Sequence, residues 1–95
     1  MIEAKWKENG EGIFEYKEGP DAPASGFIDL LQTESGKLVI KHTEVDESMS
    51  GKGIGKQLLD AVADYSRAND LKILPVCPFA KNMMYRFPEK YKDLL

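Results

Sequence analysis

The chain has 95 residues, of which 42% are hydrophobic and 31% are charged, and its formal net charge is −3 at pH 7. These values are typical of one small globular domain over residues 1–95; they exclude a disordered chain and argue against a general nucleic-acid binder, which is usually basic. No apolar run approaches the roughly 18 residues of a membrane span and the N-terminus lacks a signal-like stretch, so we expect a cytoplasmic protein without membrane contact.

The first half of the chain predicts four strands. Weak alternation over residues 3–9 and 12–17 flanks Asn9-Gly10, a pair typical of hairpin turns. Stronger apolar segments over 25–32 and 37–45 predict the next two strands. Their short connections predict an antiparallel meander.

The second half changes to helical periodicity. Apolar residues recur every three to four positions from Lys52 to Asn69, which predicts an amphipathic helix. Residues 71–74 predict a short strand, and Cys77-Pro78 begins a second helix that ends near Phe87, because proline suits the first helical position. Residues 88–95 predict a terminal turn or short helix. The order β-β-β-β-α-β-α predicts an α+β fold with a mostly antiparallel sheet.

The two halves differ in charge. Residues 1–50 hold 5 Lys against 11 Asp and Glu, a net charge of −6, whereas residues 51–95 hold 8 Lys and Arg against 5 acids, a net charge of +3. An anionic ligand would therefore favour the second half and a cationic one the first, unless both are only solvated surfaces.

The most informative stretch is Ser50-Gly51-Lys52-Gly53-Ile54-Gly55-Lys56, between a predicted strand and a predicted helix. Three alternate glycines let a ligand approach the backbone and leave N–H groups unpaired at the helix start. Those donors, the helix dipole and two lysines favour a phosphate site. The spacing fits neither the Walker pattern nor the dinucleotide fingerprint. The alternative is a connection that only permits close packing.

Residues 45–59 resemble the acyl-CoA signature of the GNAT superfamily of N-acetyltransferases, Gln/Arg-x-x-Gly-x-Gly/Ala. The signature falls on residues 50–55, with Ser50 where Gln or Arg is usual, so the backbone rather than this side chain would bind phosphate. The stretch from His42 through Phe79 is similar to a subgroup of very small GNAT-like proteins. The resemblance covers roughly residues 36–88, and earlier residues match only as a succession of strands.

The resemblance implies a minimal GNAT-like fold that binds acetyl-CoA. The strands at 37–45 and 71–77 would splay apart, with the pantetheine arm in the gap. Pro75 fits this arrangement, since proline is normally excluded from a paired central strand. The expected cofactor-binding residues are Thr43, Val45, Ser50, Gly51, Lys52, Gly53, Ile54, Gly55, Lys56, Pro78, Asn82 and Tyr85.

Four residues are candidates for catalysis of acetyl transfer. In the family pattern a tyrosine sits near the CoA sulfur, and Tyr85 in about that place would donate a proton to the departing thiolate. Cys77 is predicted at a helix N-cap, which lowers a thiol pKa, and would act as a nucleophile or only line the pocket. By alternation His42 lies on the same face of its strand as Leu38 and Ile40. It is either a core histidine or a general base. Glu44 shares that face one step nearer the loop, and it would orient an ammonium or act through water as a base.

The predicted activity is therefore acetyl-CoA-dependent N-acetyltransfer to a primary amine, such as a polyamine, a lysine side chain of a protein or another small amine. A non-catalytic acyl-CoA-binding or sensing protein and a protein-interaction domain are the alternatives. Larger GNAT members have additional helices and strands, so the acceptor side is expected to be open or completed by a second subunit, in a monomer or homodimer. One cysteine and one histidine exclude a zinc site built from these residue types alone, and no metal site is expected.

Overall fold

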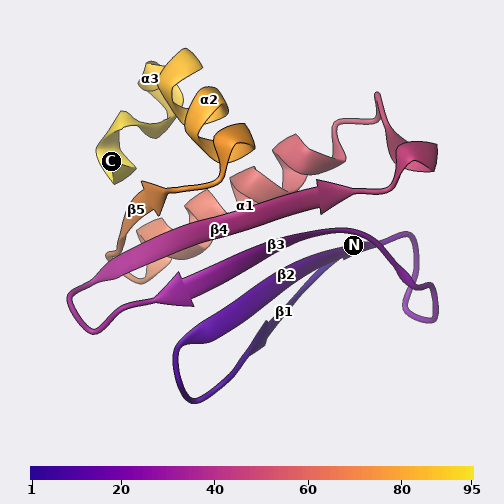
Figure 1. Ribbon diagram of the computed structural model, residues 1–95, viewed down its shortest axis with the longest axis horizontal. Helices are drawn as coiled ribbons and strands as arrows, with labels where there is room; N and C mark the ends of the chain where they lie inside the picture. Colours follow the sequence, from indigo (N-terminus) through magenta and orange to yellow (C-terminus); the bar gives the residue numbers. More distant parts are fainter.

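The computed structural model describes all of residues 1–95 and consists of a five-stranded sheet with helices after the fourth and fifth strands (Figure 1). The strands are β1 (Ile2–Trp6), β2 (Glu11–Lys17), β3 (Ala24–Gln32), β4 (Lys37–Val45) and β5 (Lys72–Pro75). The helices are α1 (Ile54–Ala68), α2 (Pro78–Arg86) and α3 (Pro88–Tyr91), with short 3-10 turns at Glu47–Met49 and Lys92–Leu94.

The sheet has the order β1-β2-β3-β4-β5, with β1 to β4 antiparallel and β5 parallel to β4. The α+β fold with a mostly antiparallel sheet is therefore confirmed. The prediction of a strand over 3–9 was too long, because the chain turns at residues 7–10. There the Lys7 amide donates to the Glu11 carbonyl at 2.8 Å, and Gly10 takes a φ of 93° that favours glycine.

The core lies between one face of the sheet and α1. The sheet contributes the buried side chains Phe14, Ile28, Leu30, Leu38 and Ile40, and α1 contributes Leu58, Leu59 and Val62. Each of these side chains stabilises the fold by roughly 1.5–3 kcal/mol through burial. In Figure 1, α1 lies behind the sheet and α2 and α3 lie beside β5. Tyr91 and Leu94 of the C-terminal segment complete the same core.

A bulge in β4 changes which side chains face the core. Asp29 pairs with His42 but Leu30 pairs with Ile40, so Lys41 is the extra residue. One extra residue reverses the alternation, and Thr43 rather than His42 continues the inner face. The prediction that His42 and Glu44 share the face of Leu38 and Ile40 was therefore wrong. The His42 side chain is 57% exposed on the outer face, which excludes a core histidine.

None of the helices combines the length and apolar character that a membrane span requires. The chain also brings together no group of three or more His, Cys, Asp or Glu side chains suited to holding a metal ion.

Candidate functional site

A hollow of about 420 Å³ lies where β4, the glycine loop, the start of α1 and α2 meet. Its lining combines loop backbone with apolar side chains from β4 and α2. The residues are Thr43, Val45, Met49, Ser50, Gly51, Gly53, Ile54, Gly55, Lys56, Phe79 and Met83. Eight of the residues predicted to bind a cofactor are thus brought to one place, namely Thr43, Val45, Ser50, Gly51, Gly53, Ile54, Gly55 and Lys56.

The predicted splay of the central strands is confirmed. The parallel pairing ends at Ile40 and Pro75, and the amides of Val76 and Cys77 both donate to the Ile40 carbonyl, at 3.1 and 3.0 Å. Beyond that point β4 continues to Val45 with a partner only in β3, as Figure 1 shows. The last residues of β4 therefore present an unpaired edge, which is open to an extended ligand.

The glycine loop keeps most of its N–H groups free. No protein acceptor pairs with the amides of Gly51, Gly53, Ile54, Gly55 or Lys56. The Ser50 amide donates to the Glu47 carbonyl at 3.1 Å, and the Lys52 amide donates to the Met49 carbonyl at 3.4 Å. Gly51 and Gly53 have φ of 80° and 73°, in the left-handed region that L side chains avoid. These free N–H donors lie at and just before the start of α1, a 15-residue helix whose dipole also favours an anion at this end.

Gly55 serves a different purpose from the other two glycines. A Cβ at this position would lie 2.8 Å from Cζ of Phe79, so glycine allows α2 to pack closely against the start of α1. Phe79 and Met83, one turn apart on α2, form the apolar wall of the hollow. Sequence reasoning missed Phe79 as a site residue, although its place one residue after Pro78 on the predicted helix was a signal.

The loop lysines differ in their surroundings. Lys52 Nζ lies 3.9 Å from Sδ of Met49, whereas Lys56 Nζ lies 3.5 Å from Asp60 Oδ2 one turn further along α1. Lys56 lines the hollow and adds positive charge beside the free amides, whereas Lys52 is not among the lining residues, so its role at a cofactor stays a prediction.

Cys77 is the N-cap residue of α2, as predicted, with Pro78 in the first turn, and it is 3% exposed. Its sulfur lies 3.4 Å from Thr43 Oγ1, within hydrogen-bond distance, and this contact joins α2 to β4 across the splay. Burial raises the pKa of this thiol, but the Thr43 hydroxyl and the amides of Ala80, Phe79 and Thr43 outweigh it, so the pKa lies below its ordinary value. Thr43 lines the hollow and Cys77 does not, so Cys77 contacts the hollow only through the Thr43 side chain.

His42 and Glu44 lie together on the outer face of β4, away from the hollow. The two side chains are 57% and 65% exposed, and His42 Nε2 lies 3.6 Å from Glu44 Oε1. The ring of Phe27, in β3 opposite Glu44, lies 5.9 Å from the His42 ring. A base in this position would have to reach the reaction from the outer side of the splay.

Tyr85 and Asn82 do not line the hollow. Tyr85 is 61% exposed on α2, and Asn82 is also exposed. The helix directs Phe79 and Met83 toward the hollow, and Tyr85 lies off that stripe. The roles of Tyr85, Asn82 and Pro78 at a cofactor stay predictions.

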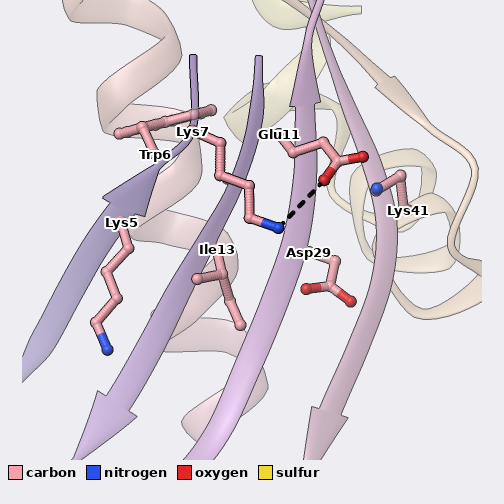
Figure 2. Close-up of a pocket in the computed structure, with 8 residues that line it drawn as sticks. Lys5, Trp6, Lys7, Glu11, Ile13, Asp29 and Lys41 are labelled. Carbon is pink, nitrogen blue, oxygen red and sulfur yellow. Dashed lines mark ion pairs between the residues drawn. The ribbon is translucent and has the colours of Figure 1, made fainter. Parts of the chain in front are cut away.

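A second hollow, also of about 420 Å³, lies over the sheet between β1 and β4 (Figure 2). Lys5, Lys7 and Lys41 lie there with Asp29 and Glu11, and Figure 2 shows the helices behind the strands. Lys7 pairs with Glu11 at 3.7 Å, and Lys5 pairs with Glu15 at 2.8 Å. This hollow contains none of the predicted site residues, and its charges largely neutralise one another.

The sequence and fold of the chain are similar to those of known acetyltransferases. A family model described as GCN5-related N-acetyl-transferase matches residues 9–94. A GCN5-like candidate N-acetyltransferase from Staphylococcus aureus is 34% identical, with a TM-score of 0.71 over 97% of this chain and 85% of that protein. Comparison with curated proteins gave no significant match.

Two larger structures share the fold at lower identity. An IAA acetyltransferase from Bacillus cereus is 22% identical, with a TM-score of 0.63 over 81% of this chain and 53% of its own. A candidate streptothricin acetyltransferase from Bacillus anthracis, solved in complex with acetyl coenzyme A, is 19% identical, with a TM-score of 0.57 over 70% and 38%. This chain therefore spans about half or less of these two proteins.

Proposed function

We propose, since the chain belongs to the family of GCN5-related N-acetyltransferases, that it transfers an acetyl group from acetyl-CoA to a primary amine. The observation that carries this proposal is the set of unpaired amides at Gly51 and residues 53–56 beside the gap between β4 and β5. A similar fold from Bacillus anthracis holds acetyl coenzyme A.

The hollow supports acetyl-CoA in two ways. The amides of the glycine loop and the start of α1 would bind the diphosphate, because several convergent N–H donors and a helix dipole stabilise its charge. The free edge of β4 at Thr43–Val45 would pair with the amides of the pantetheine arm, as one strand pairs with another. Phe79 and Met83 would cover the arm from the α2 side.

Two routes of transfer fit this proposal. In the first, a neutral amine attacks the thioester carbon directly, the CoA thiolate leaves, and Tyr85 donates its proton to that sulfur. In the second, the Cys77 thiolate attacks the same carbon, the CoA thiolate leaves, and the amine then attacks the acetyl-cysteine and releases the Cys77 thiolate. In both routes the amine loses one proton to a base, for which Glu44 and His42 are the candidates.

The acceptor is a cationic amine in this proposal. Residues 1–50 have a net charge of −6, and the Glu44 carboxylate is exposed at the outer side of the splay. A polyamine, a lysine side chain or another small primary amine meets this charge. The outer sheet face carries no helix, so the acceptor side is open or is completed by a second copy of the chain.

Isothermal titration with acetyl-CoA, followed by a screen of primary amines for acetylated products, tests the proposal. We expect saturable binding and turnover of at least one amine. Cys77→Ala should abolish transfer by the covalent route but not by the direct route, and rapid-quench mass spectrometry should show an acetylated wild-type chain only in the former case. Tyr85→Phe should slow release of CoA in either route. An absence of acetyl-CoA binding would contradict the proposal.

A non-catalytic acyl-CoA-binding protein is the second candidate. The 61% exposure of Tyr85 and its position outside the hollow favour it, because a proton donor to the thiolate should lie at the sulfur. In that case acetyl-CoA would bind, but no amine in the screen would be acetylated and Tyr85→Phe would change nothing.

A further inference from the structure

One turn beyond the glycine loop, two lysines from distant parts of the chain converge on one carboxylate. Lys56 Nζ in α1 lies 3.5 Å from Asp60 Oδ2, and Lys90 Nζ in α3 lies 2.9 Å from Oδ1 and 3.0 Å from Oδ2. The Tyr91 hydroxyl donates to Oδ1 at 2.7 Å and holds the carboxylate in place. Asp60 therefore fixes two ammonium groups beside each other.

This cluster carries a surplus of positive charge. Two ammonium groups face one carboxylate, which leaves a net charge of +1. The side chains of Lys56 and Lys90 are 55% and 42% exposed, so each keeps N–H donors toward solvent in addition to those that face Asp60. Two fixed cations with free donors are suited to a phosphate monoester, which carries nearly two negative charges and three acceptor oxygens.

The cluster also adjoins the candidate site. Lys56 lines the hollow beside the free amides and at the same time faces Asp60, so it connects the loop to Lys90. The proposed ligand has a diphosphate and, separately, a phosphate monoester on its ribose. The loop amides account for the diphosphate but leave the monoester without a partner.

We infer that Lys56 and Lys90 bind the ribose 3′-phosphate of CoA, with Asp60 and Tyr91 as positioning residues. This inference rests on the proposed function and adds a specificity: the protein prefers CoA over its 3′-dephospho form. The simpler explanation is an ion pair that only attaches α3 to α1. A purely structural pair would not distinguish two ligands that differ in this one phosphate.

Isothermal titration of the full chain with CoA and with 3′-dephospho-CoA tests the inference at low ionic strength. Partly exposed charge pairs are individually weak and screened by salt, so we expect the wild type to bind CoA about fivefold to tenfold more tightly. Lys90→Gln should reduce this ratio to below about twofold while leaving the affinity for 3′-dephospho-CoA unchanged. The matched control is Lys92→Gln, which removes an exposed lysine two residues away without an ion-pair partner and should keep the wild-type ratio.

The ratio of the affinities for CoA and 3′-dephospho-CoA does not depend on the folded fraction of a variant, because an unfolded fraction lowers the measured binding of both ligands equally. Lys56→Gln provides a second variant from the other end of the cluster and should reduce the ratio as well. A wild type that binds both ligands equally would overturn this inference alone. A preference that survives both variants would overturn it too, whereas a failure of both ligands to bind would overturn the proposed function with it.

Discussion

Gly53 offers a direct perturbation of the proposed phosphate site. It is the N-cap residue of α1, with φ 73° and ψ 22°, and a Cβ there would meet no atom within 4 Å. Gly53→Ala therefore adds backbone strain without a steric clash. Gly36, in the turn before β4, has φ 86° and the same open surroundings, which makes Gly36→Ala a matched control remote from the hollow.

The expected magnitudes follow from the conformation. An L side chain in the left-handed region costs about 1–2 kcal/mol, so both variants should lose that much free energy of unfolding. For a domain of this size each kcal/mol lowers the Tm by roughly 4–8 °C. In Gly53→Ala we expect part of this strain to be exchanged for a rotation of the amides of residues 53–55 away from the direction in which they converge. Loss of one hydrogen bond to a charged acceptor costs about 1.5–3 kcal/mol of binding, or roughly 10- to 150-fold in Kd.

The assay combines thermal melting with isothermal titration of acetyl-CoA for the two variants and the wild type. We expect similar decreases in Tm but weakened binding only in Gly53→Ala. If Gly53→Ala binds acetyl-CoA as tightly as Gly36→Ala does, the loop amides do not hold the diphosphate and the reasoning is refuted.

Three further predictions concern the surroundings of the site. Thr43→Val removes the hydroxyl that helps to hold the pKa of Cys77 below its ordinary value, so the absorbance of the Cys77 thiolate should appear at higher pH than in the wild type. Thr43→Ser should restore the wild-type titration, and an unchanged titration in Thr43→Val would contradict the role of this hydroxyl. Burial raises the pKa of Asp60, but the Tyr91 hydroxyl and the neighbouring lysines lower it by more, so the folded-state pKa lies below its ordinary value. The carboxylate therefore stabilises the fold above its unfolded pKa of about 3.9, and this stabilisation is lost as the pH falls through the lower folded-state pKa. Urea unfolding should therefore show Asp60→Asn about 1 kcal/mol less stable than wild type at neutral pH, with a gap that closes in acid; a constant gap would argue against the linkage. Leu58→Ala, at a fully buried position, should cost about 2–5 kcal/mol in the same assay, and a loss below about 1 kcal/mol would show that the core is misassigned.

Local features of the fold could be predicted from the sequence. The spacing of apolar residues predicted α1, and Cys77-Pro78 predicted the start of α2, because both patterns depend only on residues that are close in the sequence. The free amides of the glycine loop were likewise predictable, since alternate glycines before a helix leave donors unpaired.

Features that depend on distant partners could not be predicted in this way. The bulge at Lys41 exists only in the register between β3 and β4, and it moved His42 to the outer face against the simple alternation. The contact of Gly55 with Phe79 and the hydrogen bond between Cys77 and Thr43 join segments far apart in the sequence. The apolar wall of the hollow and the environment of the thiol were therefore visible only in the folded chain.

Titration of isotope-labelled protein with acetyl-CoA, followed by amide chemical shifts, tests the central claim most directly. We expect the largest shifts at the unpaired amides of Gly51 and residues 53–56, with further shifts along the free edge of β4 at residues 43–45. Shifts that cluster instead on the outer sheet face around Asp29 and Lys41, with the loop amides unmoved, would contradict it.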